Sequence, residues 1–167
     1  MLTEKQRFYR TLNAQLAALT EGEADCIANL ANASALLWQE LPGINWAGFY
    51  RMHRTAAGEE LILAPFAGKP ACIHIGVGRG VCGAAVAQNT TQLVPDVHQF
   101  PGHIACDSAS NSEIVVPLHH AGQVVGVLDI DSPQLARFDE EDKAGLEQFA
   151  ACVEQRCGAQ LAQLYGV

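Results

Sequence analysis

The sequence predicts an α+β domain in which a mainly antiparallel sheet is covered by helices from the N- and C-terminal ends of the chain. Apolar residues recur at helical spacing near both termini. The middle of the chain holds short β-prone segments, and two of them flank the tight turn Ala121-Gly122 as a hairpin. Helices that bracket strands in this way are typical of the α+β class.

Three helices follow from capping residues and apolar spacing. Thr3-Glu4-Lys5-Gln6 has the form of a capping box, and leucines at helical spacing follow it. Asp139 is expected to cap a final helix that runs to about residue 165. A second helix is expected from about residue 23 to residue 41, and its packed side is expected to carry Ile27, Leu30, Ala31, Ser34, Leu37 and Trp38.

The segments between these helices predict the sheet and the loops around it. Strands are expected at INWAGFYRM and EELILAPF, with the polar turn HRTAAGE between them, and at ACIHI, QLV, EIVVPLHH and QVVGVLDID. GVGRG predicts a tight turn before a packed helix at VCGAAVAQ. From Thr91 to Asn111 only QLV suggests a strand, so we expect an ordered loop that covers a pocket.

Composition limits the domain count and the class of partner. With 167 residues, 49% of them hydrophobic, residues 1–167 are expected to form one domain. Lys and Arg number 10 against 18 Asp and Glu, which argues against a nucleic-acid or anionic-membrane surface. The polar N-terminus and the absence of roughly 18 consecutive apolar residues predict a cytoplasmic protein. Homodimer formation is left open.

Six cysteines in such a chain direct the search for chemistry to thiols. Cys72, Cys82 and Cys106 lie in or beside segments expected to be non-helical, and they could converge on one site. In the stretch GHIACDSASNSEIVVPL, Cys106 stands in a polar loop just before a predicted strand, where a reactive thiolate could meet a ligand. The cysteines within the expected helices are interpreted as structural, and they are Cys26, Cys152 and Cys157.

Three acids near the hairpin could supply the proton that thiol chemistry requires. Glu113 opens one hairpin strand, and Asp129 and Asp131 end the other. Pairing His120 with Gln123 across the turn would place Glu113 on the opposite face from the two aspartates. Convergence therefore requires a β-bulge, for which Pro117 is a candidate position.

Other patterns are compatible with a purely structural role as well as with a functional one. Trp46 and Tyr50 lie on the same face of the predicted strand. They could form the aromatic wall of a binding site or simply pack in the core. GVGRGVCG lacks the βαβ context of a nucleotide-binding loop. Zinc could be bound by His74 and His103 together with Cys72, Cys82 and Cys106, but no pair has the usual ligand spacing. No cofactor and no metal are predicted.

The chain closely resembles the free methionine-(R)-sulfoxide reductases, which are stand-alone GAF domains. The resemblance is carried by NWAGFY, PFAGKPACIHIGVGRGVCG, DVHQFPGHIACDSASNSEIVVPL and GVLDIDS. It implies a GAF-like fold and the reduction of free methionine (R)-sulfoxide, with Cys106 as nucleophile and Cys72, or alternatively Cys82, as the resolving thiol. A sulfenic acid would condense with that thiol, and thioredoxin would reduce the disulfide.

Under this resemblance the remaining residues are expected to hold the substrate. Sulfoxide oxygen leaves only when protonated, and we expect Glu113 and Asp131 to supply the proton. Asp129 is expected to pair with the ammonium group, and Trp46 and Tyr50 to enclose the S-methyl group. Backbone N–H groups of the turn formed by His103, Ile104, Ala105 and Cys106 are expected to bind the carboxylate. The alternative is a sensory GAF domain that binds a small ligand or metal without turnover.

Overall fold

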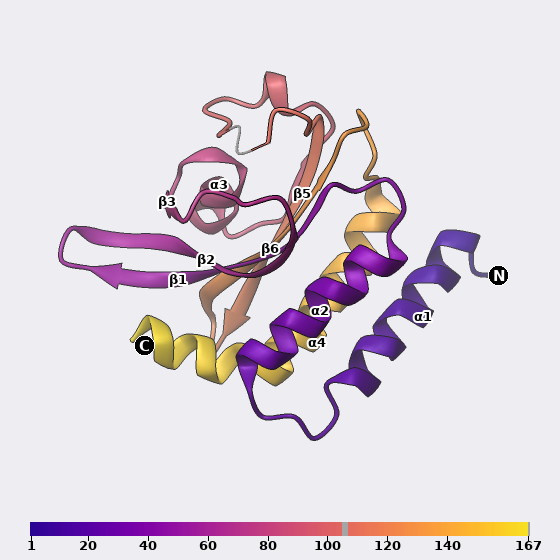
Figure 1. The fold of residues 1–167 in the computed structure, drawn as a ribbon, viewed down its shortest axis with the longest axis horizontal. Helices are drawn as coiled ribbons and strands as arrows, with labels where there is room; N and C mark the ends of the chain where they lie inside the picture. The colour runs from indigo at the N-terminus through magenta and orange to yellow at the C-terminus, as the bar shows by residue number, and fades with distance from the viewer. Residues whose placement is uncertain (105–106, 167) are drawn as a thin grey trace.

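The computed structural model describes residues 1–104 and 107–166, in which six antiparallel strands form one sheet in the order β3-β2-β1-β6-β5-β4. Figure 1 shows three of the helices on one side of this sheet and the short α3 on the other. The elements are α1 (Glu4–Leu19), α2 (Cys26–Glu40), β1 (Trp46–Thr55), β2 (Gly58–Gly68), β3 (His74–Gly76), α3 (Gly80–Gln88), β4 (Gln92–Val94), the 3-10 turn η1 (Val97–Gln99), β5 (Ser112–His120), β6 (Gln123–Ser132) and α4 (Glu140–Tyr165). The predicted fold class is confirmed.

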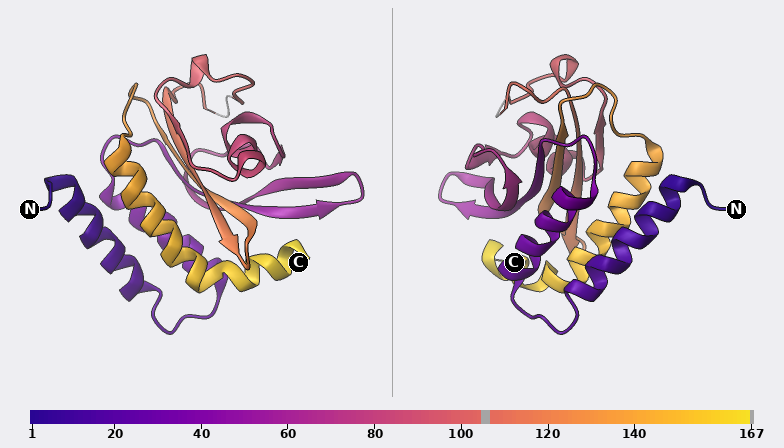
Figure 2. Two further views of the ribbon diagram at one scale, coloured as in Figure 1. Left: turned by 180° about the vertical axis from the view of Figure 1, so that it is seen from behind. Right: turned by 45° about the vertical axis from the view of Figure 1, so that its right-hand side comes forward.

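The two faces of the sheet carry two separate clusters of buried side chains, because successive strand residues point to opposite faces. On one face Phe49, Ile114 and Leu128 pack against the long helices α1, α2 and α4, which Figure 2 shows from two further sides. On the other face Tyr50 and Val127 pack with residues of α3. The first cluster is the main core, and the second surrounds the pocket described below.

The caps predicted for the terminal helices are present. Thr3 and Gln6 form a capping box at the start of α1, and Asp139 caps α4. The Tyr9 hydroxyl donates to the buried Asp142 at 2.7 Å, which fixes α1 against the start of α4. No helix within the described ranges is long and apolar enough to cross a membrane.

The hairpin of β5 and β6 contains the bulge that the acids require. His120 pairs with Gln123 as predicted, but the register shifts between Leu118 and His119. Beyond that shift Glu113 pairs with Asp131, so both point to the same face of the sheet. The extra residue lies in β6, opposite the step that follows Leu118, and not at Pro117 itself.

Helix α2 differs from its prediction in length and in the side it buries. It begins at Cys26 with Asp25 as N-cap, and Ile27 and Trp38, predicted on the packed side, are 54% and 45% exposed. The helix carries apolar residues on most of its circumference, so spacing alone does not identify the buried side. The buried side is set by contact with β1, β2 and α4, and it consists of Cys26, Asn29, Leu30, Ala33, Ser34, Leu36 and Leu37.

The turn between the first two strands is shorter than predicted. Strand β1 continues to Thr55 and β2 begins at Gly58, so most of the polar HRTAAGE segment is paired, for example His53 with Glu60. The end of this ribbon extends beyond the rest of the sheet in Figure 1. Polar strand residues are expected there because both faces of the ribbon meet solvent.

A first prediction concerns the space beside the bulge. A Cβ atom at Gly126 would lie 2.5 Å from the backbone oxygen of Tyr50 in β1. Gly126→Ala should therefore lower the free energy of unfolding by about 1–3 kcal/mol, measured by urea denaturation. Gly76→Ala is the control, because a Cβ atom there meets only the flexible Arg79 side chain. Equal stability of the two variants would contradict this account.

Candidate active site

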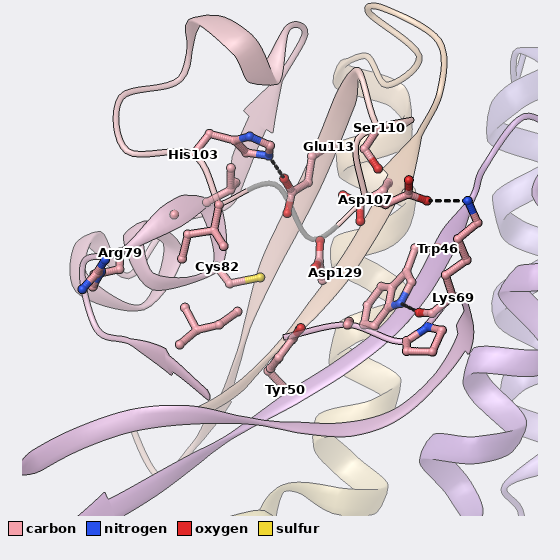
Figure 3. A pocket seen from close by; sticks show the side chains of 17 residues that line it. Trp46, Tyr50, Lys69, Arg79, Cys82, His103, Asp107, Ser110, Glu113 and Asp129 are labelled. Carbon is pink, nitrogen blue, oxygen red and sulfur yellow. Dashed lines mark hydrogen bonds and ion pairs between the residues drawn. The ribbon is translucent and has the colours of Figure 1, made fainter. Parts of the chain in front are cut away.

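A pocket lies on the sheet face opposite the long helices, between β1, β5 and β6, the start of α3 and the loop that follows η1. Figure 3 shows Cys82, Glu113 and Asp129 directed toward one another within it. Most of the residues predicted for the site line this pocket, and they are Trp46, Tyr50, Cys82, His103, Ile104, Glu113, Asp129 and Asp131. Ala105 and Cys106 lie outside the described residues.

The three acids meet because their strands present them to the same face. Glu113 and Asp129 are buried, with 6% exposure each, and Asp131 is half-buried. Burial raises the pKa of Glu113 well above its usual range, and the neighbouring Asp129 and Asp131 add to this rise. Burial and Asp129 likewise raise the pKa of Asp131. The cluster therefore favours the protonated form of Glu113 and Asp131.

Asp129 differs from the other two acids in its hydrogen bonding. Burial raises its pKa, while hydrogen bonds with Glu113 and Cys82 oppose that rise. Its Oδ1 atom is buried and has no hydrogen-bond partner among the described residues. A buried acceptor of this kind is normally satisfied, so Oδ1 is suited to receive a donor from a bound molecule.

The cysteines divide into distinct environments. Cys82 lies in the first turn of α3, the helix predicted at VCGAAVAQ, where burial and then Asp129 raise the pKa of its thiol. A thiol held neutral in this way is a poor nucleophile at neutral pH. Cys72 lies between β2 and β3 and is disulfide-bonded. The free thiols among the described cysteines are Cys26, Cys82, Cys152 and Cys157.

The predicted aromatic wall is present and is also part of the core. The Trp46 and Tyr50 rings are stacked, with centroids 5.9 Å apart. Phe66, which the sequence analysis did not select, also stacks on Trp46, with ring centroids 5.1 Å apart. The indole N–H donates to the Lys69 carbonyl oxygen, and the Tyr50 hydroxyl donates to the Cys72 carbonyl oxygen. These bonds fix an apolar wall beside the acids.

The loop between β4 and β5 closes the pocket as predicted, although its hydrogen bonds differ from the expectation. The backbone N–H of His103 donates to the Phe100 carbonyl oxygen at 3.2 Å, so it is not free for a carboxylate. The His103 imidazole instead approaches Glu113, with Nε2 3.8 Å from Oε2. Burial lowers the pKa of His103.

Four polar residues of the pocket were missed from the sequence. Asp107 and Ser110 both accept hydrogen bonds from the Asn45 amide, and Lys69 lies 3.8 Å from Asp107. Arg79, in the GVGRG turn, also lines the pocket. The position of Asp107 just after Cys106 in the same polar segment was a signal that could have identified it.

The zinc ligand set considered from the sequence does not form. His74 lies on β3, where its ring contacts Glu60 at 3.0 Å rather than the pocket. The described residues bring together a different group, because ligand atoms of Cys82, Glu113 and Asp129 all lie within 4.8 Å of one another.

The antiparallel sheet, with helices on one face and a ligand-sized pocket on the other, is the architecture of a GAF domain. A family model described as GAF domain matches residues 8–156. Comparison with individual proteins narrows this class. A free methionine-R-sulfoxide reductase of Escherichia coli is 54% identical over 151 residues, 90% of this chain and 89% of that protein. One from Saccharomyces cerevisiae is 44% identical, covering 92% of this chain and 87% of that protein.

A solved structure gives the same result. The free methionine-R-sulfoxide reductase from Neisseria meningitidis, in complex with its substrate, has a TM-score of 0.87 and 45% identity. The match covers 95% of this chain and 93% of that one. The chain belongs to the family of free methionine-R-sulfoxide reductases.

A second prediction uses the raised pKa of Glu113. A carboxyl group whose pKa is higher in the folded state stabilises the fold at low pH, and this stabilisation is lost as the pH rises toward the folded value. The glutamine side chain of Glu113→Gln does not ionise, so the variant lacks this loss of stability with rising pH. Between about pH 5 and about pH 8 its free energy of unfolding should fall less than that of the wild type.

The measurement is urea denaturation at several pH values without substrate. The control is Glu21→Gln, because Glu21 is exposed in the loop between α1 and α2. It should follow the wild-type profile. If Glu113→Gln followed that profile too, Glu113 would not be the buried acid whose ionisation destabilises the fold.

Proposed function

We propose that the chain reduces free L-methionine (R)-S-oxide to L-methionine in this pocket, and that residues 1–167 act as one catalytic domain. The observation that carries the proposal is the buried acid cluster beside an aromatic wall, with an unsatisfied oxygen on Asp129. The named activity of the relatives from Escherichia coli and Saccharomyces cerevisiae supports it, as does the substrate complex from Neisseria meningitidis.

In the proposed reaction the Cys106 thiolate attacks the sulfoxide sulfur, and the oxygen passes from that sulfur to Cys106. Methionine leaves, and Cys106 is oxidised to a sulfenic acid. A second thiol then attacks the sulfenic sulfur, which forms a disulfide and releases water. Cys72 is the proposed resolving thiol, and the buried, neutral Cys82 is the second candidate. Thioredoxin reduces the disulfide by thiol exchange.

The acids divide the remaining work between proton transfer and binding. Glu113 or Asp131, each with a raised pKa, protonates the sulfoxide oxygen. Asp129 uses its unsatisfied Oδ1 to accept a hydrogen bond from the substrate ammonium group. Trp46 and Tyr50 enclose the S-methyl group, as aromatic rings commonly do with sulfur-bearing groups.

The carboxylate of the substrate needs a donor other than the His103 amide. The proposed donors are the remaining amides of the loop from residue 104 to residue 106, together with the Lys69 and Arg79 side chains that line the pocket. Homodimer formation and a cytoplasmic location stay predictions of the sequence.

The direct test of this function is NADPH consumption with thioredoxin and its reductase. The R epimer of free methionine sulfoxide should be reduced and the S epimer should not. An N-acetylated, C-amidated analogue should react poorly, because capping removes both charges that the pocket is proposed to bind. Ligand binding without turnover of either epimer would instead favour a sensory GAF domain.

A third prediction separates the roles of the cysteines. Cys106→Ser should abolish methionine formation. Cys72→Ser should release about one methionine per chain in a single turnover and then fail to recycle with thioredoxin. Cys152→Ser is the control, because Cys152 lies on α4, away from the pocket, and its variant should keep full turnover. Multiple turnover in Cys106→Ser would disprove this mechanism.

A fourth prediction separates the acid from the ammonium-binding group. Glu113→Gln keeps the side-chain shape but removes a proton donor, so the single-turnover rate should fall by roughly 10²- to 10⁴-fold. Asp129→Asn should mainly raise KM, because it removes binding shared by the ground and transition states. Methionine release across the pH range distinguishes the two. An unchanged rate and pH profile in Glu113→Gln would assign the proton to Asp131 or to water.

A further inference from the structure

The pocket contains a set of side chains with the chemistry of metal ligands. One thiol and two carboxyl groups, from Cys82, Glu113 and Asp129, have ligand atoms within 4.8 Å of one another, and all three are buried. Tetrahedral zinc at about 2.0–2.3 Å from sulfur and oxygen places its ligands roughly 3.3–3.8 Å apart. Since the three ligand atoms lie within 4.8 Å of one another, binding would have to draw them together by no more than roughly 1.5 Å.

A second, independent observation points to a bound positive group at the same place. The Oδ1 atom of Asp129 is buried, faces the pocket and lacks a hydrogen-bond partner among the described residues. The His103 imidazole lies 3.8 Å from the Glu113 carboxylate, as the dashed line in Figure 3 marks. His103 is not one of the three grouped ligands, but at this distance a small movement would let it hydrogen-bond to Glu113 and orient that carboxylate.

We infer that Cys82, Glu113 and Asp129 form a site for a zinc-class divalent cation, and that the bound cation inhibits the enzyme. A thiolate ligand selects zinc-class ions over magnesium or calcium, which prefer oxygen alone. As the cation binds, the Cys82 thiol and the carboxyl groups release their protons to solvent. No electrons are transferred, so binding of the cation is reversible.

The cation would inhibit the enzyme because it would bind to oxygens that the proposed reaction uses. This half of the inference rests on the proposed function. The cation would take the Asp129 oxygen proposed for the substrate ammonium group and would hold Glu113 deprotonated. Cation and substrate would then exclude each other. At a zinc concentration ten times its dissociation constant, the sulfoxide concentration for half-maximal rate should rise by about 11-fold.

Binding is tested first with cobalt, which reports its own ligands. The full chain is reduced with a phosphine, freed of metal and titrated with Co²⁺ without oxygen. One Co²⁺ per chain should bind, with the thiolate charge-transfer absorption of a Co–S bond, and Zn²⁺ should displace it. Cys82→Ser should lose this absorption, and Asp129→Asn should bind at least about tenfold more weakly. Cys152→Ser should behave as the wild type.

Variants of the other pocket-region cysteines show which thiol is the ligand. Cys72→Ser and Cys106→Ser should keep the Co–S absorption. Its survival in Cys82→Ser, its loss in Cys106→Ser, or the absence of stoichiometric binding would overturn the inferred site. Inhibition is measured separately, as methionine released in a single turnover with added Zn²⁺, because dithiols and thioredoxin bind zinc themselves.

The two readouts keep this inference distinguishable from the proposed function. A chain that binds Co²⁺ through Cys82 but reduces neither epimer would keep the cation site and refute the reductase assignment. An active chain whose single-turnover rate is unaffected by bound Zn²⁺ would overturn the inhibitory role. An active chain that binds no cation would refute the site alone.

Discussion

One extra residue in β6 decides which face of the sheet carries the acids. Without the bulge after Leu118, the turn register would place Glu113 opposite Ile130. That register would direct either Glu113 or the two aspartates into the apolar core beneath the long helices. With the bulge, Glu113 pairs with Asp131, while Ile114 and Ile130 enter that core together. The bulge therefore places the three acids on the pocket face and Ile114 and Ile130 in the main core.

The two faces of the sheet have different roles, because one carries the buried acids of the pocket and the other carries most of the apolar core. Buried acids with raised pKa values oppose folding at neutral pH, because the charged forms lose their solvation. The opposite face carries the larger apolar cluster, in which residues such as Phe149, Leu37 and Leu128 are fully buried. Burial of such residues is worth about 1.5–3 kcal/mol each, which offsets an unfavourable site elsewhere in the same sheet.

The sequence predicted the features that depend on local chemistry. Capping residues located α1 and α4, and the Ala121-Gly122 turn located the hairpin. The need for a bulge was also predicted, but its position was not. Pro117 lacks an N–H donor, yet the unpaired residue lies in the partner strand, next to Gly126. A glycine inside a strand often marks a bulge, and this signal was not used.

Long-range packing explains the parts of the site and fold that were not predicted. The buried side of α2 depends on its contacts with β1, β2 and α4, and apolar residues on most of its circumference do not identify that side. Lys69 and Arg79 were not selected from the sequence, because only the folded chain brings them to the pocket. Cys82 was predicted beside the GVGRG turn, but no local signal showed that α3 would bury its thiol next to Glu113 and Asp129.

The acid cluster needs positive charge, and the neighbouring side chains supply little of it. Lys69 lies beside Asp107, and Arg79 is exposed. Positive charge can reach the Glu113 and Asp129 oxygens in three other ways: as protons, as the proposed substrate ammonium group or as the inferred cation. The ammonium group and the cation would both use the Asp129 oxygen, and the cation would also displace the proton from Glu113. The carboxyl groups proposed to donate a proton are also the groups that would bind a cationic ligand. The affinity of the pocket for such a ligand should therefore depend on pH and on the concentration of available metal.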